Sequence, residues 1–291
     1  MSEQQADLAL AIDAARRAGA VVMRYFGRDL VVEHKTPDQP LTEADLAANA
    51  VLHEVLIGAR PDYGWLSEET RDHPDRLARS RVWIVDPIDG TTSFIAELPE
   101  FAISVGLVHD GVPIVGVVYN PARDEMYHAA RGAGAFISRG GATAEPVHVS
   151  GRRIDDRVTM LASRGEIAAG EFDPFRGGWR IEPAGSTAYK LAGVAAGAGE
   201  AFVSRGPKSE WDICAGVLLV SEAGGRATDL DGAALRFNRE DPYVHGILAT
   251  NGVVHDAVLT SIGEMPATAR LRARPDPLHP GLNEESEAWE S

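Results

Sequence analysis

The stretch WIVDPIDGTTSF, residues 83–94, combines an apolar run, two aspartates and a tight turn. The apolar run up to Asp86 is short and rich in β-branched residues, which is typical of a buried strand. A proline and a glycine then force the chain to turn, and we expect a helix to begin near Thr91. The sequence therefore predicts a strand from Arg81 to Asp86, followed by a tight turn that carries Asp89.

Helical periodicity is found on the N-terminal side of this stretch. Residues 5–27 carry apolar side chains at helical spacing and predict an amphipathic helix that stops near a glycine. The polar segment HKTPDQPLTEAD, residues 34–45, contains two prolines, and we expect it to be irregular. Thr42 is a candidate cap for the next helix, which would place Asp45 in the first helical turn.

Strand patterns dominate the residues that follow. Asp110 and Gly111 separate two apolar runs, which is a hairpin signal. The first half of the chain is therefore predicted to hold helices followed by an antiparallel meander. Its expected strands cover residues 101–108, 113–119, 125–130 and 134–138.

Beyond about residue 150, strands and helices alternate, which predicts layered α/β structure. We predict an N-terminal α+β lobe, 1–150, and a C-terminal α/β lobe, 151–264, with a cleft between them. Residues 265–291 are rich in proline and charge and are predicted to be a mobile tail. The expected strands of the second half cover residues 159–163, 200–204, 225–230 and 245–251, and the expected helices 186–197, 211–225 and 253–263.

The composition is that of a folded, acidic protein. Hydrophobic residues make up 44% of the 291 positions, which suffices for a sizeable core. The formal net charge of -15 argues against a nucleic-acid polymer or an anionic membrane surface as the main partner. Cys214 is the single cysteine, so an internal disulfide is excluded and a cytoplasmic location is expected. The sequence predicts neither a signal peptide nor a membrane span.

Asp86 and Asp89 are the first candidate functional residues. Two carboxylates at one strand end can converge on a hard cation such as Mg²⁺. The Gly90, Thr91 and Thr92 segment would offer backbone N–H groups at a helix start, which suit a phosphate group. A metal site beside a phosphate site is what metal-assisted phosphoryl transfer requires. The alternative is a simple turn in which one aspartate caps the chain.

Two other acidic groups extend this pattern. Glu68 and Glu69 directly follow an apolar stretch, so one of them is expected to point inward, where a carboxylate needs a partner or a metal. A solvated pair of loop charges is the alternative. Asp212 lies at the start of a strongly apolar helix, where it could be a metal ligand or part of an acidic N-terminal cap. The joint occurrence of these groups favours a functional site over the simpler alternatives.

The motifs resemble those of the inositol monophosphatase superfamily in order and spacing. The matching segments are LTEAD, SEE, WIVDPIDGTTSF, GVVYNPARDEMYHAARGAGAF and WDICAG followed by EAGG. The resemblance covers roughly residues 5–262. It implies an α/β fold of the layered αβαβα sandwich type and Mg²⁺-dependent, usually Li⁺-sensitive, hydrolysis of phosphomonoesters. It also implies a small phosphorylated metabolite as partner, and homodimers are common in the family.

The resemblance implies a ligand set for two or three Mg²⁺ ions. Glu68, Asp86 and the carbonyl group of Ile88 would hold one ion. Asp86, Asp89 and Asp212 would hold the second, so that Asp86 bridges the two. A third, weaker ion could lie near Glu68. The N-terminal lobe would carry this metal site, and the C-terminal lobe would complete it.

The resemblance also implies catalytic and phosphate-binding residues. Thr91 and Asp45, together with Glu68 and the first ion, would orient and deprotonate the attacking water. The backbone N–H groups of Gly90 and Thr91, with Thr92 beside them, would hold the phosphate oxygens.

Basic residues are expected at the substrate end of the site. Inositol-specific members of the family carry a glutamate about seven residues before the aspartate of the WD motif, whereas this chain has Arg205 there. The segment GSTAYKLAGVAAG resembles one in 3′(2′),5′-bisphosphate nucleotidases, in which Lys190 could reach a second phosphate. The expected substrate contacts are Ser163, Arg164, Gly185, Ser186, Lys190, Arg205 and Lys208.

The basic side chains at the substrate end favour a 3′(2′),5′-bisphosphate nucleotidase, which would convert 3′-phosphoadenosine-5′-phosphate to AMP and phosphate. An inositol-1-monophosphatase is the main alternative, and fructose-1,6-bisphosphate and histidinol phosphate are further candidate substrates. The basic residues could instead be ordinary solvated side chains. In a different class, the chain could be a catalytically inactive regulator that binds metal, although every expected ligand is present.

Overall fold

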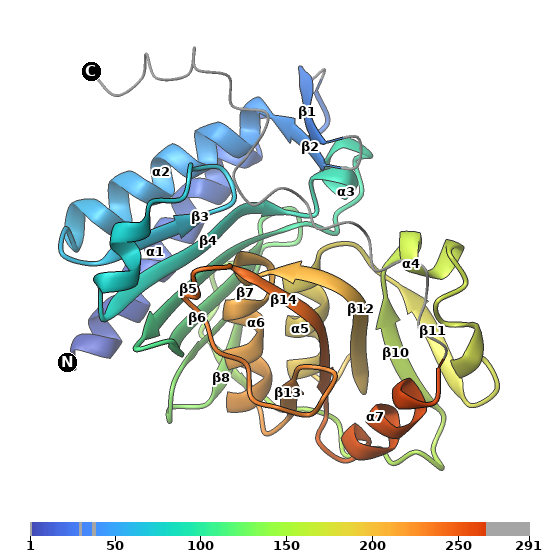
Figure 1. Ribbon diagram of the computed structural model, residues 1–291. Helices are drawn as coiled ribbons and strands as arrows, with labels where there is room; N and C mark the ends of the chain where they lie inside the picture. The colour runs from blue at the N-terminus through green and yellow to red at the C-terminus, as the bar shows by residue number, and fades with distance from the viewer. Residues whose placement is uncertain (1, 29–30, 37–38, 266–291) are drawn as a thin grey trace.

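Helices and sheets alternate in layers through the molecule (Figure 1). The computed structural model describes residues 2–28, 31–36 and 39–265. The layers are a helix pair, a seven-stranded sheet, a second helix pair, a five-stranded sheet and an outer helical layer. The predicted αβαβα sandwich is therefore confirmed. The predicted mobile tail lies outside the described residues, except for Met265.

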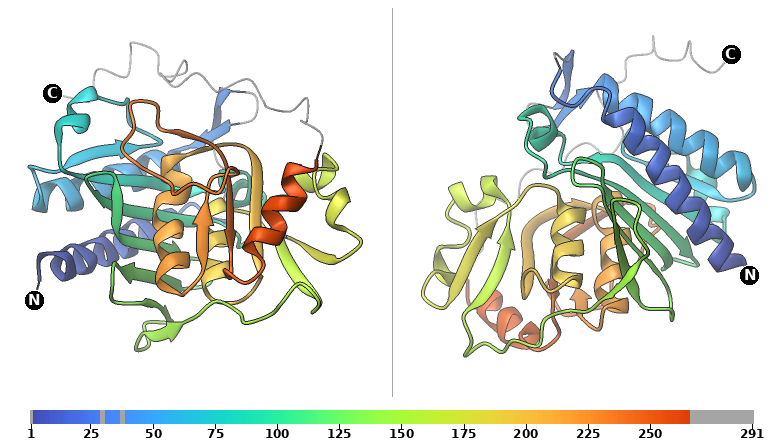
Figure 2. Two further views of the ribbon diagram at one scale, coloured as in Figure 1. Left: turned by 60° about the horizontal axis from the view of Figure 1, so that its bottom comes forward. Right: turned by 180° about the vertical axis from the view of Figure 1, so that it is seen from behind.

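The first layer consists of α1 (Glu3–Val22) and α2 (Glu43–Ala59), which cover the outer face of the larger sheet (Figure 2). Each helix begins with a capping box, in which the cap side chain and the third helical residue each bond to the other's backbone. In α2 this pair is Thr42 and Asp45, so the predicted cap is confirmed.

Two predictions for the N-terminal region were wrong. The first helix ends at Val22, several residues earlier than predicted, where a series of turns begins. The segment 34–45, expected to be irregular, takes part in a hairpin of β1 (Val32–Thr36) and β2 (Gln39–Thr42). Pro40 is tolerated there because both strands of a two-stranded ribbon are edges, where a missing N–H need not break a ladder bond.

The seven-stranded sheet has the strand order β3-β4-β5-β6-β7-β8-β9. β3 is parallel to β4, and all other neighbours are antiparallel. Asp110 and Gly111 form the predicted hairpin turn, both with positive φ. The strands are β3 (Gly64–Ser67), β4 (Arg81–Asp89), β5 (Ala102–His109), β6 (Val112–Asn120), β7 (Glu125–Ala130), β8 (Ala135–Arg139) and β9 (Glu145–Val147), and a short 3₁₀ helix, η1 (Pro74–Ala78), precedes β4.

The five-stranded sheet has the order β11-β10-β12-β14-β13. β10 is parallel to β11 and β12, whereas β14 is antiparallel to β12 and β13. Every strand except β11 was predicted from the sequence. The strands are β10 (Val158–Ala162), β11 (Trp179–Pro183), β12 (Ala201–Ser209), β13 (Arg226–Thr228) and β14 (Tyr243–Thr250).

The second helix pair, α5 (Thr187–Ala195) and α6 (Glu210–Glu222), is packed between the two sheets. α6 approaches the larger sheet closely at two glycines. A Cβ atom added to Gly106 would lie 2.6 Å from the sulfur of Cys214, and one added to Gly116 would lie 2.7 Å from a carbonyl oxygen of the helix. The missing side chains therefore allow α6 to lie directly on β5 and β6.

The outer layer packs on the far face of the smaller sheet. It consists of α4 (Arg164–Ala168), a short 3₁₀ helix, η2 (Asp173–Phe175), and α7 (His255–Gly263). Of these, only α7 was predicted. Within the part of the chain that the structure describes, no helix has both the length and the apolar character that a membrane crossing requires.

Candidate active site

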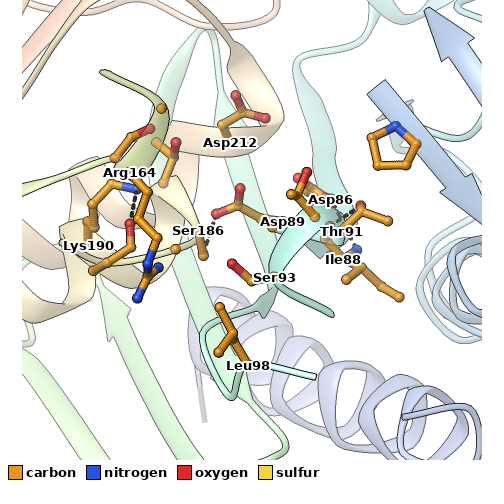
Figure 3. Close-up of a pocket in the computed structure, with 18 of the residues that line it drawn as sticks. Asp86, Ile88, Asp89, Thr91, Ser93, Leu98, Arg164, Ser186, Lys190 and Asp212 are labelled. Atoms are coloured by element: carbon orange, nitrogen blue, oxygen red, sulfur yellow. Dashed lines mark hydrogen bonds between the residues drawn. The ribbon is translucent and has the colours of Figure 1, made fainter. Parts of the chain in front are cut away.

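A cavity of about 610 Å³ lies among the end of β4, the start of α6 and the loops that follow β10 and β11 (Figure 3). Its walls therefore come from segments that are distant in the sequence. All of the predicted site residues line this cavity except Asp45 and Arg205. The carboxylates gather at one side, and Arg164 and Lys190 lie at the other.

A β-bulge brings two aspartates of β4 to the same cavity. Residues three positions apart in a regular strand point to opposite faces of the sheet. Here Asp86 pairs with Ser104 and Asp89 pairs with Ala102, so three steps along β4 match two along β5. The extra residue restores both aspartates to one face, where both line the cavity. The backbone N–H of Ile88 donates to Asp86 Oδ1 at 2.9 Å and fixes its orientation.

Glu68 and Asp212 reach the same place from other elements. Glu68 directly follows β3, and its backbone N–H donates to the carbonyl oxygen of Val85, one residue before Asp86. Asp212 is the third residue of α6, whose cap is Ser209 and not an acidic residue as expected. One carboxylate oxygen each from Glu68, Asp86 and Asp212 lies within 4.8 Å of the other two.

Burial and mutual repulsion govern the electrostatics of this carboxylate cluster. Burial, followed by repulsion from Glu68 and Asp89, raises the pKa of Asp86 well above its usual range. Burial and the same two neighbouring carboxylates raise the pKa of Asp212 in the same way. Burial also raises the pKa of Asp89, but hydrogen bonds from Ser186 and the charge of Lys190 oppose that shift.

The carboxylate cluster fits a hard divalent cation. Its donors are all oxygen atoms, which Mg²⁺ prefers. Positive charge at this position would relieve the burial and repulsion that raise the pKa values of Asp86 and Asp212. Each aspartate of the cluster also accepts hydrogen bonds from the protein. Asp86 accepts from the Ile88 backbone and Asp212 from the Ser209 backbone, whereas Asp89 accepts at Oδ2 from the Ser186 hydroxyl and the Ala188 backbone.

Thr91 and Asp45 form a hydrogen-bonded pair beside the cluster. Asp45 lies behind Thr91 and is 1% exposed. Its Oδ1 atom is 3.2 Å from the Thr91 hydroxyl oxygen, and its Oδ2 atom accepts from the backbone and hydroxyl of Thr42. The Thr91 hydroxyl is also 3.1 Å from the Ile88 carbonyl oxygen. Since a hydroxyl carries one proton, it donates to only one of these acceptors at a time.

The turn before α3 (Thr91–Ile95) holds the predicted phosphate-binding residues. Gly90 has a φ of 98°, a left-handed conformation that favours glycine. A Cβ atom there would lie 3.1 Å from the carbonyl oxygen of Glu100 and 3.2 Å from the backbone nitrogen of Ser186. This glycine therefore lets the turn, with Thr91 and Thr92, lie close against the loop that follows β11.

The basic residues at the substrate end have different surroundings. Lys190 is buried, donates to the Ala184 carbonyl oxygen at 3.3 Å and packs on the ring of Phe202. Burial lowers the pKa of Lys190 to about 8, against the attraction of Asp89. Lys208 lines the cavity, and its Nζ atom is 3.9 Å from a carboxylate oxygen of Glu166.

Neither Arg205 nor Arg164 presents an unpaired positive charge to the cavity. Arg205 lies in an irregular part of β12, between Ser204 and Pro207, outside the cavity lining. Arg164 lines the cavity at its rim, but both ends of its guanidinium bond to the carboxylate of Glu100.

Glu100 and Glu166 are the main residues of this region that sequence reasoning missed. Glu100 also accepts a hydrogen bond of 2.8 Å from the Gly185 backbone, so it joins the loops that follow α3, β10 and β11. Glu166 accepts from the Ser204 hydroxyl at 2.6 Å. Their partners are 38 to 85 positions away in the chain, so no local pattern could have indicated these contacts.

Comparison with known proteins agrees with the fold and the motifs. The model of the inositol monophosphatase family matches residues 3–266. An inositol-1-monophosphatase of Mesorhizobium japonicum is 36% identical over 271 residues, 89% of this chain and 96% of that protein. A histidinol-phosphatase of Mycobacterium tuberculosis is 37% identical over 264 residues, 88% of this chain and 97% of that protein. The crystal structure of the extragenic suppressor protein suhB from Bartonella henselae superposes with a TM-score of 0.78 at 31% identity, and covers 90% of this chain and 100% of that one.

A family match over this length settles the class. The chain belongs to the inositol monophosphatase family. It is a phosphoric monoester hydrolase of the metal-dependent kind, which removes the alternative of a protein without enzymatic activity.

Proposed function

We propose that this enzyme uses Mg²⁺ to hydrolyse a small phosphorylated metabolite, with 3′(2′),5′-bisphosphate nucleotides as the preferred substrates. The observation that carries the metal assignment is the meeting of Glu68, Asp86 and Asp212 within 4.8 Å at the wall of the cavity. Lithium sensitivity and a cytoplasmic location are parts of the same proposal, and Cys214 as a buried free thiol suits a reducing compartment.

Five residues would hold the metal ions. Glu68, Asp86 and the Ile88 carbonyl oxygen would bind one ion, and Asp86, Asp89 and Asp212 would bind the other. Bound divalent cations supply positive charge that lowers the pKa of a coordinated water and stabilises the leaving oxygen. The chain itself contributes the carboxylates, of which Asp86 and Asp89 are buried at the end of β4 and Asp212 lies in the first turn of α6.

Thr91 and Asp45 would orient and deprotonate the attacking water. When the Thr91 hydroxyl donates to Asp45 Oδ1, its lone pairs remain to accept a hydrogen bond from water. A proton that leaves the water can then pass to the threonine oxygen while the threonine proton passes to Asp45. Asp45 is held for this role by Thr42, which donates through its backbone and its hydroxyl. The N–H groups of Gly90 and Thr91 would hold the phosphate oxygens.

The preference for a bisphosphate substrate rests on Lys208. Lys208 lines the cavity and is 20% exposed in its side chain, so it is available to a second phosphate. Arg164 could bind a phosphate of the substrate only after its ion pair with Glu100 is broken. Lys190 would contribute a fixed positive charge at the cavity wall, since its side chain is buried.

Inositol-1-phosphate and histidinol phosphate are the second candidates. They are favoured by the names of two relatives, an inositol-1-monophosphatase at 36% identity and a histidinol-phosphatase at 37% identity. The pairing of Arg164 with Glu100 also favours them, because it leaves less free positive charge for a second phosphate.

The test is phosphate release in Mg²⁺ from 3′-phosphoadenosine-5′-phosphate, inositol-1-phosphate and histidinol phosphate, each with and without Li⁺. We expect the nucleotide to have the highest kcat/KM, and Lys208→Ala to lower it about 10-fold or more through the loss of a charged contact. The same substitution should change the monophosphates much less. Preference for a monophosphate, or equal effects of Lys208→Ala on all substrates, would contradict the nucleotidase assignment and leave the metal assignment intact.

A further inference from the structure

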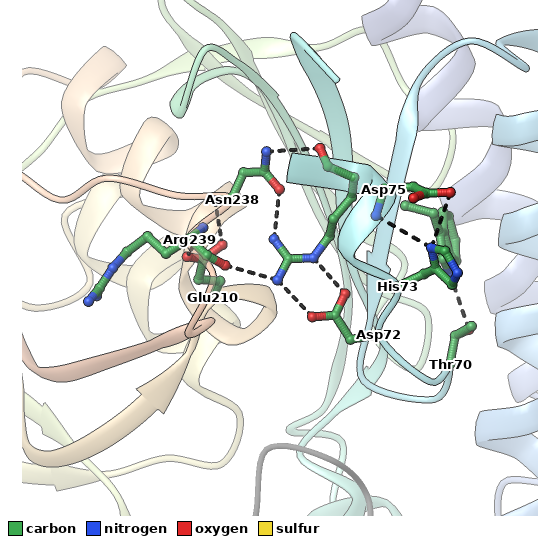
Figure 4. Close-up of polar contacts among 9 residues, drawn as sticks. Thr70, Asp72, His73, Asp75, Glu210, Asn238 and Arg239 are labelled. Atoms are coloured by element: carbon green, nitrogen blue, oxygen red, sulfur yellow. Dashed lines mark hydrogen bonds and ion pairs between the residues drawn. The ribbon is translucent and has the colours of Figure 1, made fainter. Parts of the chain in front are cut away.

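A buried arginine, Arg76, connects the two segments that bring Glu68 and Asp212 to the metal site. Its partners Asp72, Asn238 and Arg239 are labelled in Figure 4. Arg76 belongs to η1 and is 3% exposed. It bonds to both carboxylate oxygens of Asp72, at 2.6 and 2.7 Å, and to the Asn238 side chain at 2.7 Å and the Arg239 carbonyl oxygen at 2.9 Å. We call these residues, together with Glu210, the Arg76 network.

The far end of the Arg76 network is the first turn of α6. The backbone N–H groups of Asn238 and Arg239 donate to the two carboxylate oxygens of Glu210, at 2.6 and 3.1 Å. Glu210 is the first residue of α6 and is fully buried. The loop that receives the arginine therefore also fixes the start of the helix that carries Asp212.

The near end of the Arg76 network is the segment that carries Glu68. Asp72 follows Glu68 by four residues, and η1 packs directly on β3. A Cβ atom on Gly64, at the start of β3, would lie 3.2 Å from the Cβ atom of Arg76. Asn238 also returns a bond of 3.2 Å to the backbone carbonyl oxygen of Arg76. Bonds in both directions thus join the two segments.

We propose that Arg76 is a positioning residue for the metal centre, which fixes the separation of the Glu68 and Asp212 carboxylates. The inference rests on the proposed role of these two residues as metal ligands. A guanidinium suits this task because its planar fork holds one carboxylate in a fixed direction while its remaining N–H group binds a second segment. A lysine in its place would keep the charge and lose this directional hold.

Arg76→Lys tests the proposal. Asp72→Asn is a second variant, which removes the partly exposed carboxylate of the same ion pair. The readout is Mg²⁺ binding by calorimetry to the full-length, metal-free protein. We expect either variant to raise the Mg²⁺ dissociation constant by on the order of tenfold, the size typical of residues that orient metal ligands. We expect kcat at saturating Mg²⁺ to stay near the wild-type value, since added metal restores occupancy.

Arg81→Lys is the matched control. Arg81 is also a largely buried arginine, bonded to Tyr63 and Glu3, but it lies at the start of β4, at the end opposite Asp86 and Asp89. This variant should lower the melting temperature and leave the Mg²⁺ dissociation constant unchanged. Wild-type affinity in both Arg76→Lys and Asp72→Asn, or an equal loss in Arg81→Lys, would overturn the positioning role.

Asp212→Asn in the same titration separates the two proposals. If the wild type binds Mg²⁺ and Asp212→Asn does not, the metal assignment stands, and the Arg76 variants alone decide the positioning role. If Asp212→Asn binds Mg²⁺ as tightly as the wild type, the metal assignment itself is wrong and the role of Arg76 falls with it.

Discussion

At the scale of single residues, the carboxylates that suit a metal ion also destabilise the metal-free fold. Burial and mutual repulsion raise the pKa of Asp86 and of Asp212, which means that their ionised forms are unfavourable where they lie. Active sites commonly trade stability for function in this way. The substitution of one aspartate by asparagine removes a charge and keeps the shape.

We therefore predict opposite effects of Asp212→Asn on stability and on turnover. In EDTA the variant should be more stable than the wild type by about 0.5–2 kcal/mol, measured by urea unfolding. In Mg²⁺ its kcat should fall by about 10²–10³-fold or more, as expected for the loss of a group that organises charge in the transition state. Asp13→Asn is the control, since Asp13 is half-exposed on α1, and it should change neither quantity. Full activity in Asp212→Asn would contradict the ligand assignment.

At the scale of elements, α7 is attached to the smaller sheet through a buried histidine. His255 is fully buried, and its ring nitrogens are each 3.0 Å from a hydroxyl, Nε2 from Thr228 and Nδ1 from Thr250. The Thr228 hydroxyl donates to the Asp229 carbonyl oxygen, so it accepts from Nε2–H, and Nδ1 accepts from Thr250. This arrangement requires a neutral ring. Burial, with a smaller contribution from Arg226, accordingly lowers the pKa of His255 to about 4.

The lowered pKa predicts a loss of stability at acidic pH. The unfolded chain, with an ordinary pKa near 6.5, takes up the proton first as the pH falls, so the stabilisation is complete above 6.5 and is lost between 6.5 and about 4. Each pKa unit is about 1.4 kcal/mol, so the full loss is about 3 kcal/mol. Urea unfolding at pH 7.5 and 4.5 should show a smaller pH dependence for His255→Gln than for the wild type. His73→Gln, at an exposed position, is the control, and an equal pH dependence in all three proteins would contradict the prediction.

Local patterns in the sequence were sufficient for most elements. The start of β4, the meander after it and the α5 and α6 helices follow from apolar periodicity and turn residues, which act over a few positions. The predicted end of β4 at Asp86 was wrong, because the strand continues through a bulge to Asp89. The β1–β2 hairpin was missed because proline usually argues against a strand, whereas in a two-stranded ribbon both strands are edges and tolerate it. β11 was missed because it lies at a sheet edge with only partly buried side chains, so its apolar pattern is weak.

The candidate site was predictable only in part, for a related reason. Its carboxylates stand in short motifs, and the structure brings Glu68, Asp86 and Asp212 together. Contacts between segments that are far apart in the chain produce no local sequence motif. The bond from Arg76 to Asn238 spans 162 positions, and the pair of Arg164 and Glu100 spans 64. The position of Arg205 outside the cavity lining depends on an irregularity in β12 that its neighbours in the sequence do not indicate.

At the scale of the whole molecule, one apolar core joins both sheets. The middle helices α5 and α6 contact the larger sheet at residues such as Ile84 and the smaller sheet at residues such as Phe202, within a single cluster. The division into lobes 1–150 and 151–264 stays a prediction, but neither half can bury its inner face without the other.

We therefore predict one cooperative unfolding transition for the full chain. Circular dichroism and tryptophan fluorescence should give coincident urea curves for the intact protein. A fragment of residues 1–150 expressed alone should lack a cooperative transition, because it exposes the sheet face that α6 covers. The full chain treated in the same way is the control, and two resolved transitions in it would contradict the prediction.

The origin of the cavity walls has an evolutionary consequence. Its three aspartates lie on β4 and on α6, which the core holds, so few substitutions there are compatible with a folded protein. The opposite wall comes from loops after α3, β10 and β11, where exchanges disturb little packing. Descendants of one ancestral hydrolase can thus diverge in the molecule they recognise while they inherit the same chemistry. Relatives of nearly equal similarity that carry the names inositol-1-monophosphatase and histidinol-phosphatase are what such a history would leave.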